Sequence, residues 1–288
     1  MSLFKYLSPE RRDFFETLQL RYSQPASFND PFEAKPYFTG FMPEPNMIRS
    51  YPNRFQRILA QQYRSMSEEF RVEVSFNAFA TELEFMRPEV YQILRDVDAS
   101  SVPQINAMMH ESFGCKIGVL SLSECNNSHL MWAHYAKSHH GFVLEFDEKH
   151  PFFQERDFGA DDIWNIHKVC YAAERPQTSV LELDFRAILL TKHTDWSYER
   201  EWRDFRPFNR ACTVIESQPF PIYLYKLPPE CLRGVIFGAR MDSKFVEQIA
   251  EIIKGHTLLR HITLSKAELD DRTYAVRIAA LQSQELHQ

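Results

Sequence analysis

Apolar residues gather in short segments along the chain, and several of these segments alternate between apolar and polar positions. A period of two is typical of strands, whose successive side chains point to opposite faces of a sheet. The segment 195–205 has an ambiguous pattern, and its aromatic content favours a strand. Clearer strand patterns cover the segments 18–23, 117–123, 142–147, 167–172, 222–227, 233–239, 261–267 and 273–281.

Other segments carry apolar residues three and four positions apart, which is the spacing of one helix face. Ser128, and either Asp242 or Ser243, stand where N-caps are expected, and Gly141 and Gly255 stand where helices would stop. Helices are therefore predicted over the segments 9–18, 129–140, 181–190 and 241–255.

The stretch from 49 to 112 also shows helical spacing, and it separates two regions of predicted strands. We therefore expect a single domain over residues 1–288, with 49–112 as a helical insertion. Runs of strands interrupted irregularly by helices are typical of the α+β class. The predicted fold is α+β, with a mixed, largely antiparallel sheet.

Glycine is scarce: the chain has 8 Gly in 288 residues, against 24 Phe. Average usage is about 7% Gly, and no two glycines here stand closer than four positions apart. A dinucleotide-binding G-x-G-x-x-G turn and a Walker A loop both need clustered glycines, so both are excluded. Ligand recognition is therefore expected from side chains, in a cleft with aromatic walls.

Charge and cysteine content restrict the partners. The net charge is −6, so nucleic-acid binding is not indicated by a domain-wide basic excess. The five cysteines are widely spaced without a C-x-x-C pair, as expected of reduced thiols in a cytoplasmic protein. The chain shows no signal-peptide pattern and no apolar run of 18 residues, so we expect a cytoplasmic location and no membrane partner.

The first candidate segment for a site is SFNDPFE, near the N-terminus. One interpretation is a structural turn, in which Asn29 and Asp30 bond to nearby backbone N–H groups while Phe28 and Phe32 pack inward. The other interpretation places Asn29, Asp30 and Glu33 in a cleft as ligand-binding residues. The two carboxylates would then be acid/base groups or metal ligands.

The second candidate combines a strand with the helix that follows it. Ser121 and Ser123 share one face of the predicted strand, where their hydroxyls would orient a ligand or tolerate a wet surface. Trp132, His134 and Tyr135 suit ligand stacking, with His134 as a proton carrier or as a structural histidine. The histidines of this region stand five apart, so no zinc site is expected from them.

The third candidate is the segment WSYEREWR. On a strand, Glu199, Glu201 and Arg203 project to one side, with the two carboxylates about 6.6 Å apart. Arg203 would keep Glu201 ionised, while Glu199 would have a raised pKa because of its charged neighbour. Such a difference suits a general acid/base pair. The alternative is a ladder of ion pairs on a solvated face.

The motifs SFNDPFE, MWAHYA, GFVLEF, WSYEREWR and GVIFGA together resemble an uncharacterised bacterial family, known only as a domain of unknown function. The resemblance covers roughly residues 3–36 and 115–255 and leaves the helical middle as the variable part. It implies no established activity.

A fainter, fold-level similarity concerns the ADP-ribosyltransferase-like enzymes. These enzymes use a basic residue on an early strand, a hydroxyl on a central one and a Glu, often in E-x-E, on a late one. Lys5, the serines 121 and 123, and the pair Glu199 and Glu201 follow that order here. The similarity implies that Glu201 polarises a ribose hydroxyl and that NAD is the substrate, although Lys5 stands where the family has Arg or His.

Three functions follow from these patterns. The first is an enzyme acting on a nucleotide-type ligand, by ADP-ribosyl transfer or NAD hydrolysis, with Glu201, Glu199 and His134 as catalytic residues. The second is a Mg²⁺-dependent nuclease with Asp30, Glu33 and Glu199 as ligands. The third is a non-catalytic ligand-sensing or defence-associated module. For the first function, no metal site is expected, and the ligand-binding residues are Asn29, Asp30, Glu33, Ser121, Ser123, Trp132, Tyr135 and Arg203.

Overall fold

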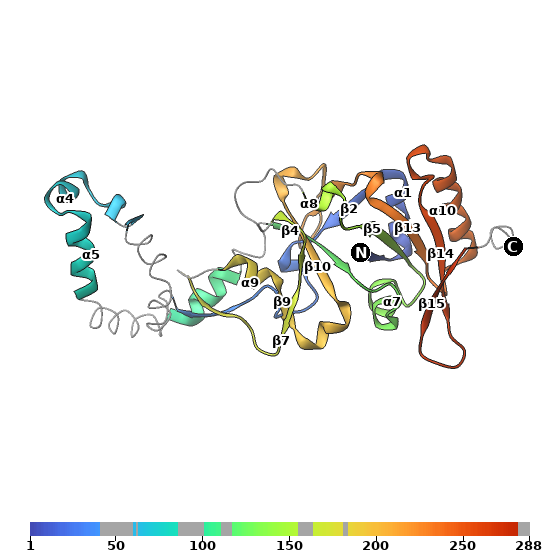
Figure 1. The fold of residues 1–288 in the computed structure, drawn as a ribbon, viewed down its shortest axis with the longest axis horizontal. Coiled ribbons are helices and arrows are strands. Elements are labelled where there is room, and N and C mark those ends of the chain that lie inside the picture. The colour runs from blue at the N-terminus through green and yellow to red at the C-terminus, as the bar shows by residue number, and fades with distance from the viewer. Residues whose placement is uncertain are drawn as a thin grey trace. The chain divides into compact units, whose positions relative to one another are not determined.

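The chain divides into two compact units, which are described separately (Figure 1). The first consists of Met1–Ala34, Phe113–Glu174 and Leu189–Gln288, and the second of Lys35–Ser112 and Arg175–Ile188. The structure is a computed structural model, and it describes residues 1–40, 60–61, 63–85, 101–110, 117–154, 164–180 and 184–281.

The first unit is built on an eight-stranded sheet. All neighbouring strands are antiparallel except β13 and β14, which are parallel and connected through a crossover helix. The fold is therefore α+β with a mixed, largely antiparallel sheet, as predicted. In spatial order the strands are β15 (Val276–Ala280), β14 (Thr263–Leu269), β13 (Leu232–Phe237), β5 (Phe142–Asp147), β1 (Ser2–Leu7), β4 (Ile117–Ser123), β10 (Glu201–Pro207) and β6 (His167–Lys168).

Two helices cover opposite faces of this sheet. Alternate residues of β1 point to different cores: Leu3 lies in the same buried cluster as Ile249 of α10 (Ser243–Gly255). Phe4 lies instead with Trp132 of α7 (His129–Tyr135). Helix α10 runs beside β13, β14 and β15 in Figure 1. Its N-cap is Asp242, whose carboxylate accepts a hydrogen bond from the Lys244 N–H.

Short elements complete the first unit. They comprise a three-stranded sheet, β11 (Thr213–Ile215), β12 (Ile222–Lys226) and β2 (Gln19–Tyr22), and a parallel pair, β7 (Cys170–Ala172) and β9 (Thr191–His193). The short α-helices are α1 (Phe14–Thr17) and α8 (Pro151–Gln154). The 3-10 helices are η1 (Pro9–Asp13), η2 (Pro25–Ser27), η5 (Thr194–Glu199), η6 (Phe208–Arg210), η7 (Pro229–Cys231) and η8 (Thr257–Leu259).

In its described residues, the second unit contains helices and a small parallel sheet. The helix α9 (Phe185–Leu190) begins in this unit and ends in the first. The predicted helical insertion over 49–112 falls partly outside the described residues, so its extent stays a prediction; the described parts are largely helical. The elements are β3 (Tyr37–Gly40), β8 (Gln177–Ser179), α4 (Glu68–Glu73), α5 (Phe76–Phe85) and a helix over 101–110.

The segment after α7 differs from its prediction. The helix ends at Tyr135 instead of continuing to about His140, although Ser128 caps its N-terminus as expected. Gly141 is therefore not a helix stop. Gly141 directly precedes β5. A Cβ atom added to Gly141 would lie only 2.0 Å from the Leu7 carbonyl oxygen. The tight contact of two backbones explains why glycine is needed there.

Two further predictions are corrected. The strand expected over 195–205 is wrong in its first half, because Glu199 ends the 3-10 helix η5 and only β10 is extended. The single helix predicted over 9–18 is instead the 3-10 helix η1 followed by the short helix α1, and Leu18 is left-handed. Among the described residues, no helix combines the length and the apolar character needed to cross a membrane.

Candidate functional site

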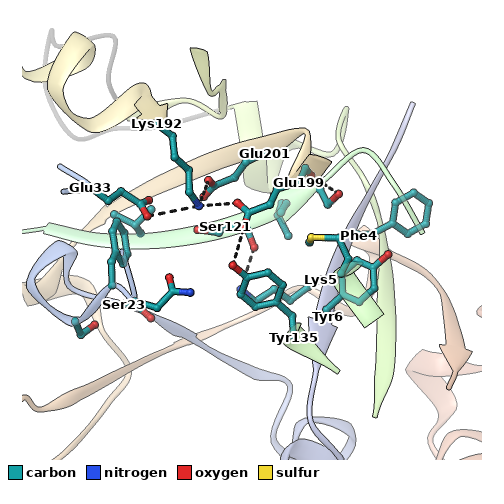
Figure 2. A pocket seen from close by; sticks show the side chains of 17 residues that line it. Phe4, Lys5, Tyr6, Ser23, Glu33, Ser121, Tyr135, Lys192, Glu199 and Glu201 are labelled. Atoms are coloured by element: carbon teal, nitrogen blue, oxygen red, sulfur yellow. Dashed lines mark hydrogen bonds and ion pairs between the residues drawn. The ribbon is translucent and has the colours of Figure 1, made fainter. Parts of the chain in front are cut away.

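A cavity of about 320 Å³ lies beside strands β1 and β4 of the main sheet. The strands β1 and β4 pair only at Phe4 and Ser123, whereas β4 pairs with β10 along its whole length. Beside that single pair, the Lys5 ammonium donates a hydrogen bond to the Ser121 carbonyl oxygen at 2.9 Å. Side chains from β1, β4, α7, β9, η5, β10 and the loop after β2 line the cavity (Figure 2).

The inner wall of the cavity is a buried cluster of charges centred on Lys192. Its Nζ atom lies 2.6 Å from Glu199 Oε2, 3.2 Å from Glu201 Oε2 and 3.5 Å from Glu33 Oε2. All four side chains are at most 4% exposed. Figure 2 shows the lysine pointing from β9 toward the three carboxyl groups.

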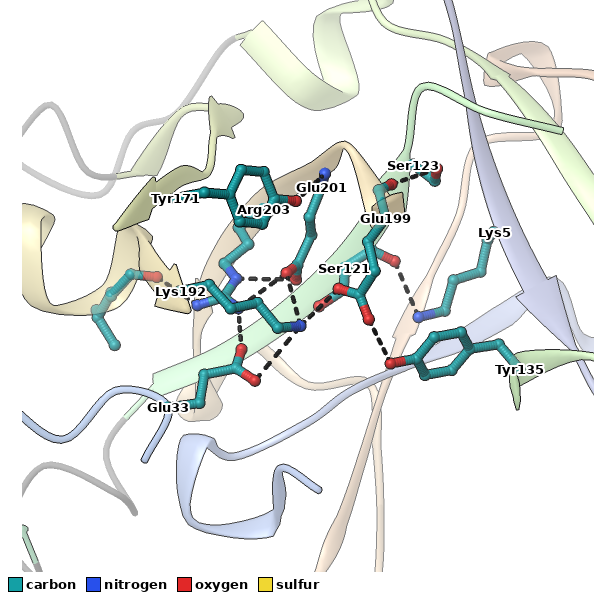
Figure 3. Close-up of polar contacts among 11 residues, drawn as sticks. Lys5, Glu33, Ser121, Ser123, Tyr135, Tyr171, Lys192, Glu199, Glu201 and Arg203 are labelled. Carbon is teal, nitrogen blue, oxygen red and sulfur yellow. Dashed lines mark hydrogen bonds and ion pairs between the residues drawn. The ribbon is translucent and has the colours of Figure 1, made fainter. Parts of the chain in front are cut away.

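Arg203 forms the second centre of the cluster (Figure 3). Its Nε and Nη2 atoms donate to the two oxygens of Glu201 at 2.9 and 3.0 Å. The same guanidinium contacts Glu33 and donates to the Leu189 carbonyl oxygen at 2.5 Å. The Phe28 ring centroid lies 5.3 Å from Arg203 Cζ, and Arg203 is fully buried. These contacts hold its guanidinium in one orientation.

Local structure explains how these groups meet. Alternation along β10 places Glu201 and Arg203 on one face, opposite Ser123 and Ser121 of β4. Arg200 has a left-handed conformation (φ 45°), which turns the chain between η5 and β10 and allows Glu199 to reach the same cluster from the helix.

The parallel pair of strands β7 and β9 supplies Lys192, the cation at the centre of the cluster. Tyr171 of β7 lies in register with Lys192 of β9. The Tyr171 hydroxyl accepts a hydrogen bond from the Glu201 N–H at 2.8 Å, so β7 is tied to the start of β10. The Ser123 hydroxyl donates to the Glu199 carbonyl oxygen at 2.6 Å and fixes the turn from the other side.

The cluster shifts the pKa values of Glu199 and Glu201 in opposite directions. Burial would raise the pKa of Glu201, but the charges of Arg203 and Lys192 outweigh burial and bring that pKa down to about 2. Burial raises the pKa of Glu199, and the nearby charge of Glu201 adds to the effect against the opposing charge of Lys192. These are the directions expected from the sequence.

Burial also shifts two further groups. It raises the pKa of Glu33 above its ordinary value, although Arg203 opposes the shift. It lowers the pKa of Lys5 to about 8, against the attraction of the carboxylates. A half-buried amine with a pKa of about 8 therefore lines the same cavity as the carboxyl groups.

A chain of hydrogen bonds leads from the cluster to the mouth of the cavity. The half-buried Tyr135 donates its hydroxyl to Glu199 Oε1 at 2.5 Å, and the exposed Asn29 bonds to the same hydroxyl. Figures 2 and 3 show the Tyr135 hydroxyl pointing at the Glu199 carboxyl group. A proton on Glu199 is therefore connected to the solvent side of the cavity.

The structure brings most of the predicted site residues together. The residues that line the cavity are Asn29, Glu33, Ser121, Ser123, Tyr135, Glu199 and Glu201. Arg203 lies behind them and holds Glu33 and Glu201. The three segments singled out in the sequence therefore converge on one cavity.

Three predicted residues lie elsewhere. Asp30 forms the expected turn, with Oδ1 accepting from the Phe32 N–H at 2.8 Å, but Phe32 is exposed instead of packed inward. Trp132 is fully buried, edge-on to Tyr6, so it does not offer a stacking surface to a ligand. His134 is exposed, with its ring near Tyr135, and does not line the cavity.

Sequence reasoning missed the central lysine. Lys192 stands alone between apolar and polar residues, and no spacing pattern connects it to the carboxylates. Phe28 and Tyr171 were likewise not assigned to the cluster, because their contacts depend on how distant strands meet. Only the low frequency of buried lysines would have drawn attention to such a residue, once the strand β9 was known.

The carboxyl groups do not form a metal site in this arrangement. Asp30 is used in its turn, and the cations of Lys192 and Arg203 lie between Glu33, Glu199 and Glu201, where a metal ion would have to sit. Among the described residues, no group of three or more His, Cys, Asp or Glu side chains is arranged to hold a metal ion. The donors proposed for a nuclease therefore do not fit Mg²⁺.

The comparison with known proteins concerns the segment that carries most of this cluster. No curated protein and no solved structure matches the chain. Residues 131–203 match the model of a family described as "Protein of unknown function (DUF2971)". That segment, which includes Tyr135, Lys192, Glu199, Glu201 and Arg203, is therefore similar to this uncharacterised family.

Proposed function

We propose that the cavity binds a nucleotide-type ligand and that the protein cleaves the N-glycosidic bond of NAD, transferring the ADP-ribosyl group to water or to an acceptor group. The observation that carries the proposal is the pair of buried carboxyl groups, Glu199 and Glu201, with opposite pKa shifts on the wall of one cavity. Paired titratable groups whose pKa values diverge are typical of acid/base sites.

The charge balance of the cluster supports this chemistry. Three carboxyl groups, those of Glu33, Glu199 and Glu201, face the two cations of Lys192 and Arg203. When all five groups are ionised, this cluster has a net charge of −1, and the Lys5 amine at the same cavity offsets it only while Lys5 is protonated. A wall with this net negative charge stabilises the positive charge that develops on a ribose C1′ atom as its bond to nitrogen lengthens.

The proposed step is balanced without any further reactant. The C1′–N bond breaks and its electron pair goes to the nicotinamide nitrogen, which leaves as a neutral ring. Water, or an acceptor hydroxyl, forms the new bond to C1′. Glu199 takes the proton that the nucleophile releases, because its raised pKa makes it the stronger base. Glu201, held ionised by Arg203, supplies the negative charge.

Three further side chains have positioning roles in this scheme. Ser121 contributes a hydrogen bond to Glu201 from inside the cavity and is placed to meet a ribose hydroxyl. Tyr135 and Asn29 connect Glu199 to the mouth of the cavity and provide its exit for the proton. The sequence suggested His134 as the proton carrier, but His134 does not line the cavity, so the scheme assigns proton transfer to Glu199 and Tyr135 instead.

The test compares the wild type with Glu199→Gln and Glu201→Gln, each incubated with NAD. Nicotinamide release is measured by chromatography and protein modification with labelled NAD, with and without Mg²⁺. Removing a positioned base or a charge-stabilising group costs about 100-fold or more in rate, so both variants are expected to lose at least that factor. Glu251→Gln, on the exposed side of α10, is the matched control and keeps full activity.

Thermal melting of the same variants separates catalysis from folding. The expected result is a folded Glu199→Gln protein without activity. The proposal is overturned if folded wild type releases no nicotinamide and NAD does not raise its melting temperature. Cleavage of nucleic acid only in the presence of Mg²⁺ would favour the nuclease. Binding of NAD without turnover would favour the sensing module.

A further inference from the structure

A second cavity, of about 380 Å³, adjoins the first. Ser27, the last residue of η2, and Phe28, which follows it, line both cavities and form the wall between them. The remaining wall of the second cavity comes from Arg21 of β2, Ile222 of β12 and the loop between β11 and β12. Glu33, Glu199 and Glu201 do not line this second cavity.

Arg21 gives the second cavity a different electrostatic character. Its Nε atom is buried and has no hydrogen-bond partner among the described residues. Burial lowers the pKa of Arg21, and the positive charge of nearby Arg11 lowers it further, with no carboxylate acting against them. None of the residues that line this cavity is acidic. A half-buried guanidinium without a counter-charge is costly, so the cavity favours an anion.

The first cavity is less suited to an anion, because both of its amines are already engaged: Lys192 by the three carboxyl groups and Lys5 by the Ser121 carbonyl oxygen. Its wall holds Glu33, Glu199 and Glu201, which repel a phosphate group that enters beside them. A ligand that places a ribose against those carboxylates and also carries a phosphate must put the phosphate in a neighbouring, positive space. The second cavity, one segment away, meets this requirement.

We propose that Arg21 and the cavity around it form a phosphate subsite, which binds the 5′-phosphate attached to the ribose held in the first cavity. The inference rests on the proposed function and specifies its substrate class as a phosphorylated nucleotide. The planar guanidinium can donate two parallel hydrogen bonds to phosphate oxygens, and the unpartnered Nε–H is one of the donors required. Phe28 lines both cavities and would lie between the ribose in the first cavity and the phosphate in the second.

The test uses nicotinamide mononucleotide and nicotinamide riboside, which differ only by the 5′-phosphate. Binding is measured by calorimetry in the Glu199→Gln background, so that neither compound is consumed. One charge-assisted pair corresponds to about 10-fold to 100-fold in affinity. The mononucleotide should bind more tightly by such a factor, and Arg21→Gln should reduce the preference to about 1. Arg260→Gln, an exposed arginine on the same unit, is the matched control and keeps the preference.

The outcomes separate the subsite from the reaction. A preference that persists unchanged in Arg21→Gln overturns the phosphate subsite, as does NAD cleavage by Arg21→Gln with an unchanged KM. If wild type does not cleave NAD but binds the mononucleotide or pyrophosphate in an Arg21-dependent way, the subsite stands and the reaction fails. Should Arg21→Gln not fold, Arg21→Lys replaces it, because the loss of the planar fork must still weaken the preference several-fold.

Discussion

Helix α10 packs against the main sheet and strand β10 is part of it, but the two elements bury different kinds of side chain. Val246, Ile249 and Ile253 of α10 pack into an apolar core. Glu201 and Arg203 of β10 are 3% and 0% exposed, and their contacts are mainly charges. Apolar burial stabilises a fold by about 25 cal/mol per Å². A buried ion cluster adds little over apolar residues of the same volume.

The difference separates a region that stabilises the fold from the region that carries the proposed site. The α10 side chains in this core are aliphatic and carry no group that could act on a ligand. The cluster on β10 keeps three carboxyl groups next to two cations at the edge of a cavity, an arrangement that stability alone does not require. Proteins commonly accept such a cost where a function depends on it.

The largest expected effect is that of Arg203→Met. The substitution leaves Glu33 and Glu201 buried without their guanidinium, so the free energy of unfolding should fall by about 3–5 kcal/mol. Chemical denaturation at pH 7 measures the loss. The triple variant Glu33→Gln, Glu201→Gln, Arg203→Met removes the uncompensated charges and should recover at least half of it. An equal loss in the triple variant would mean that packing, and not charge, makes Arg203 important.

Ile249→Ala should have the next largest effect and should act on stability alone. Ile249 is fully buried, so truncation leaves a cavity in the apolar core and lowers the free energy of unfolding by about 3 kcal/mol. The affinity for nicotinamide mononucleotide is expected to stay the same, and calorimetry at a temperature where the variant is folded checks it. Ile249→Val, with a loss of about 1 kcal/mol, is the graded control. A change in affinity would contradict the division between the two regions.

The smallest effect concerns the pH dependence of stability. Glu201 has a lowered pKa of about 2, so its contribution is present above its ordinary pKa near 4.5 and is lost as the pH falls toward 2. Glu199 has a raised pKa, so its contribution is present at low pH and is lost as the pH rises through its folded value. Each group can change the slope by at most about 1.4 kcal/mol per pH unit.

Denaturation curves over a pH series would detect these slopes. Glu201→Gln should flatten the curve on the acid side, and Glu199→Gln should flatten it on the side of rising pH. Lys5, with its pKa lowered to about 8, acts in the opposite direction there, so each variant is compared with wild type at the same pH. Ile249→Ala should shift the whole curve without changing its shape. Parallel curves for all three variants would mean that the carboxyl groups are not differentiated.

Much of the fold could be predicted because its signals are local. The strands 117–123 and 142–147 follow from apolar patterning over six or seven residues, and the structure has both with the same bounds. Helix α10 follows from its apolar stripe and from the capping side chain of Asp242. Turn residues such as Asp30 satisfy backbone groups two positions away, which neighbouring residues suffice to specify.

Other features depended on contacts that no local pattern contains. The sequence favoured one strand through Glu199 and Glu201, but the left-handed Arg200 ends a helix between them. Gly141 resembled a helix stop and is instead required by the close approach of the Leu7 carbonyl. In both cases the tertiary packing overrode a local preference of less than a few kcal/mol.

The sequence by itself determined the α+β class, most strands and the residue types that the proposed acid/base chemistry needs. Only the tertiary structure decided that Lys192 lies among three carboxyl groups and that Arg203 reaches Glu33, 170 positions away. It also excluded Trp132 and His134 from the cavity and placed Arg21 beside it. Backbone propensities act over a few residues, whereas the position of a buried charge is fixed by whichever partners the packed strands bring to it.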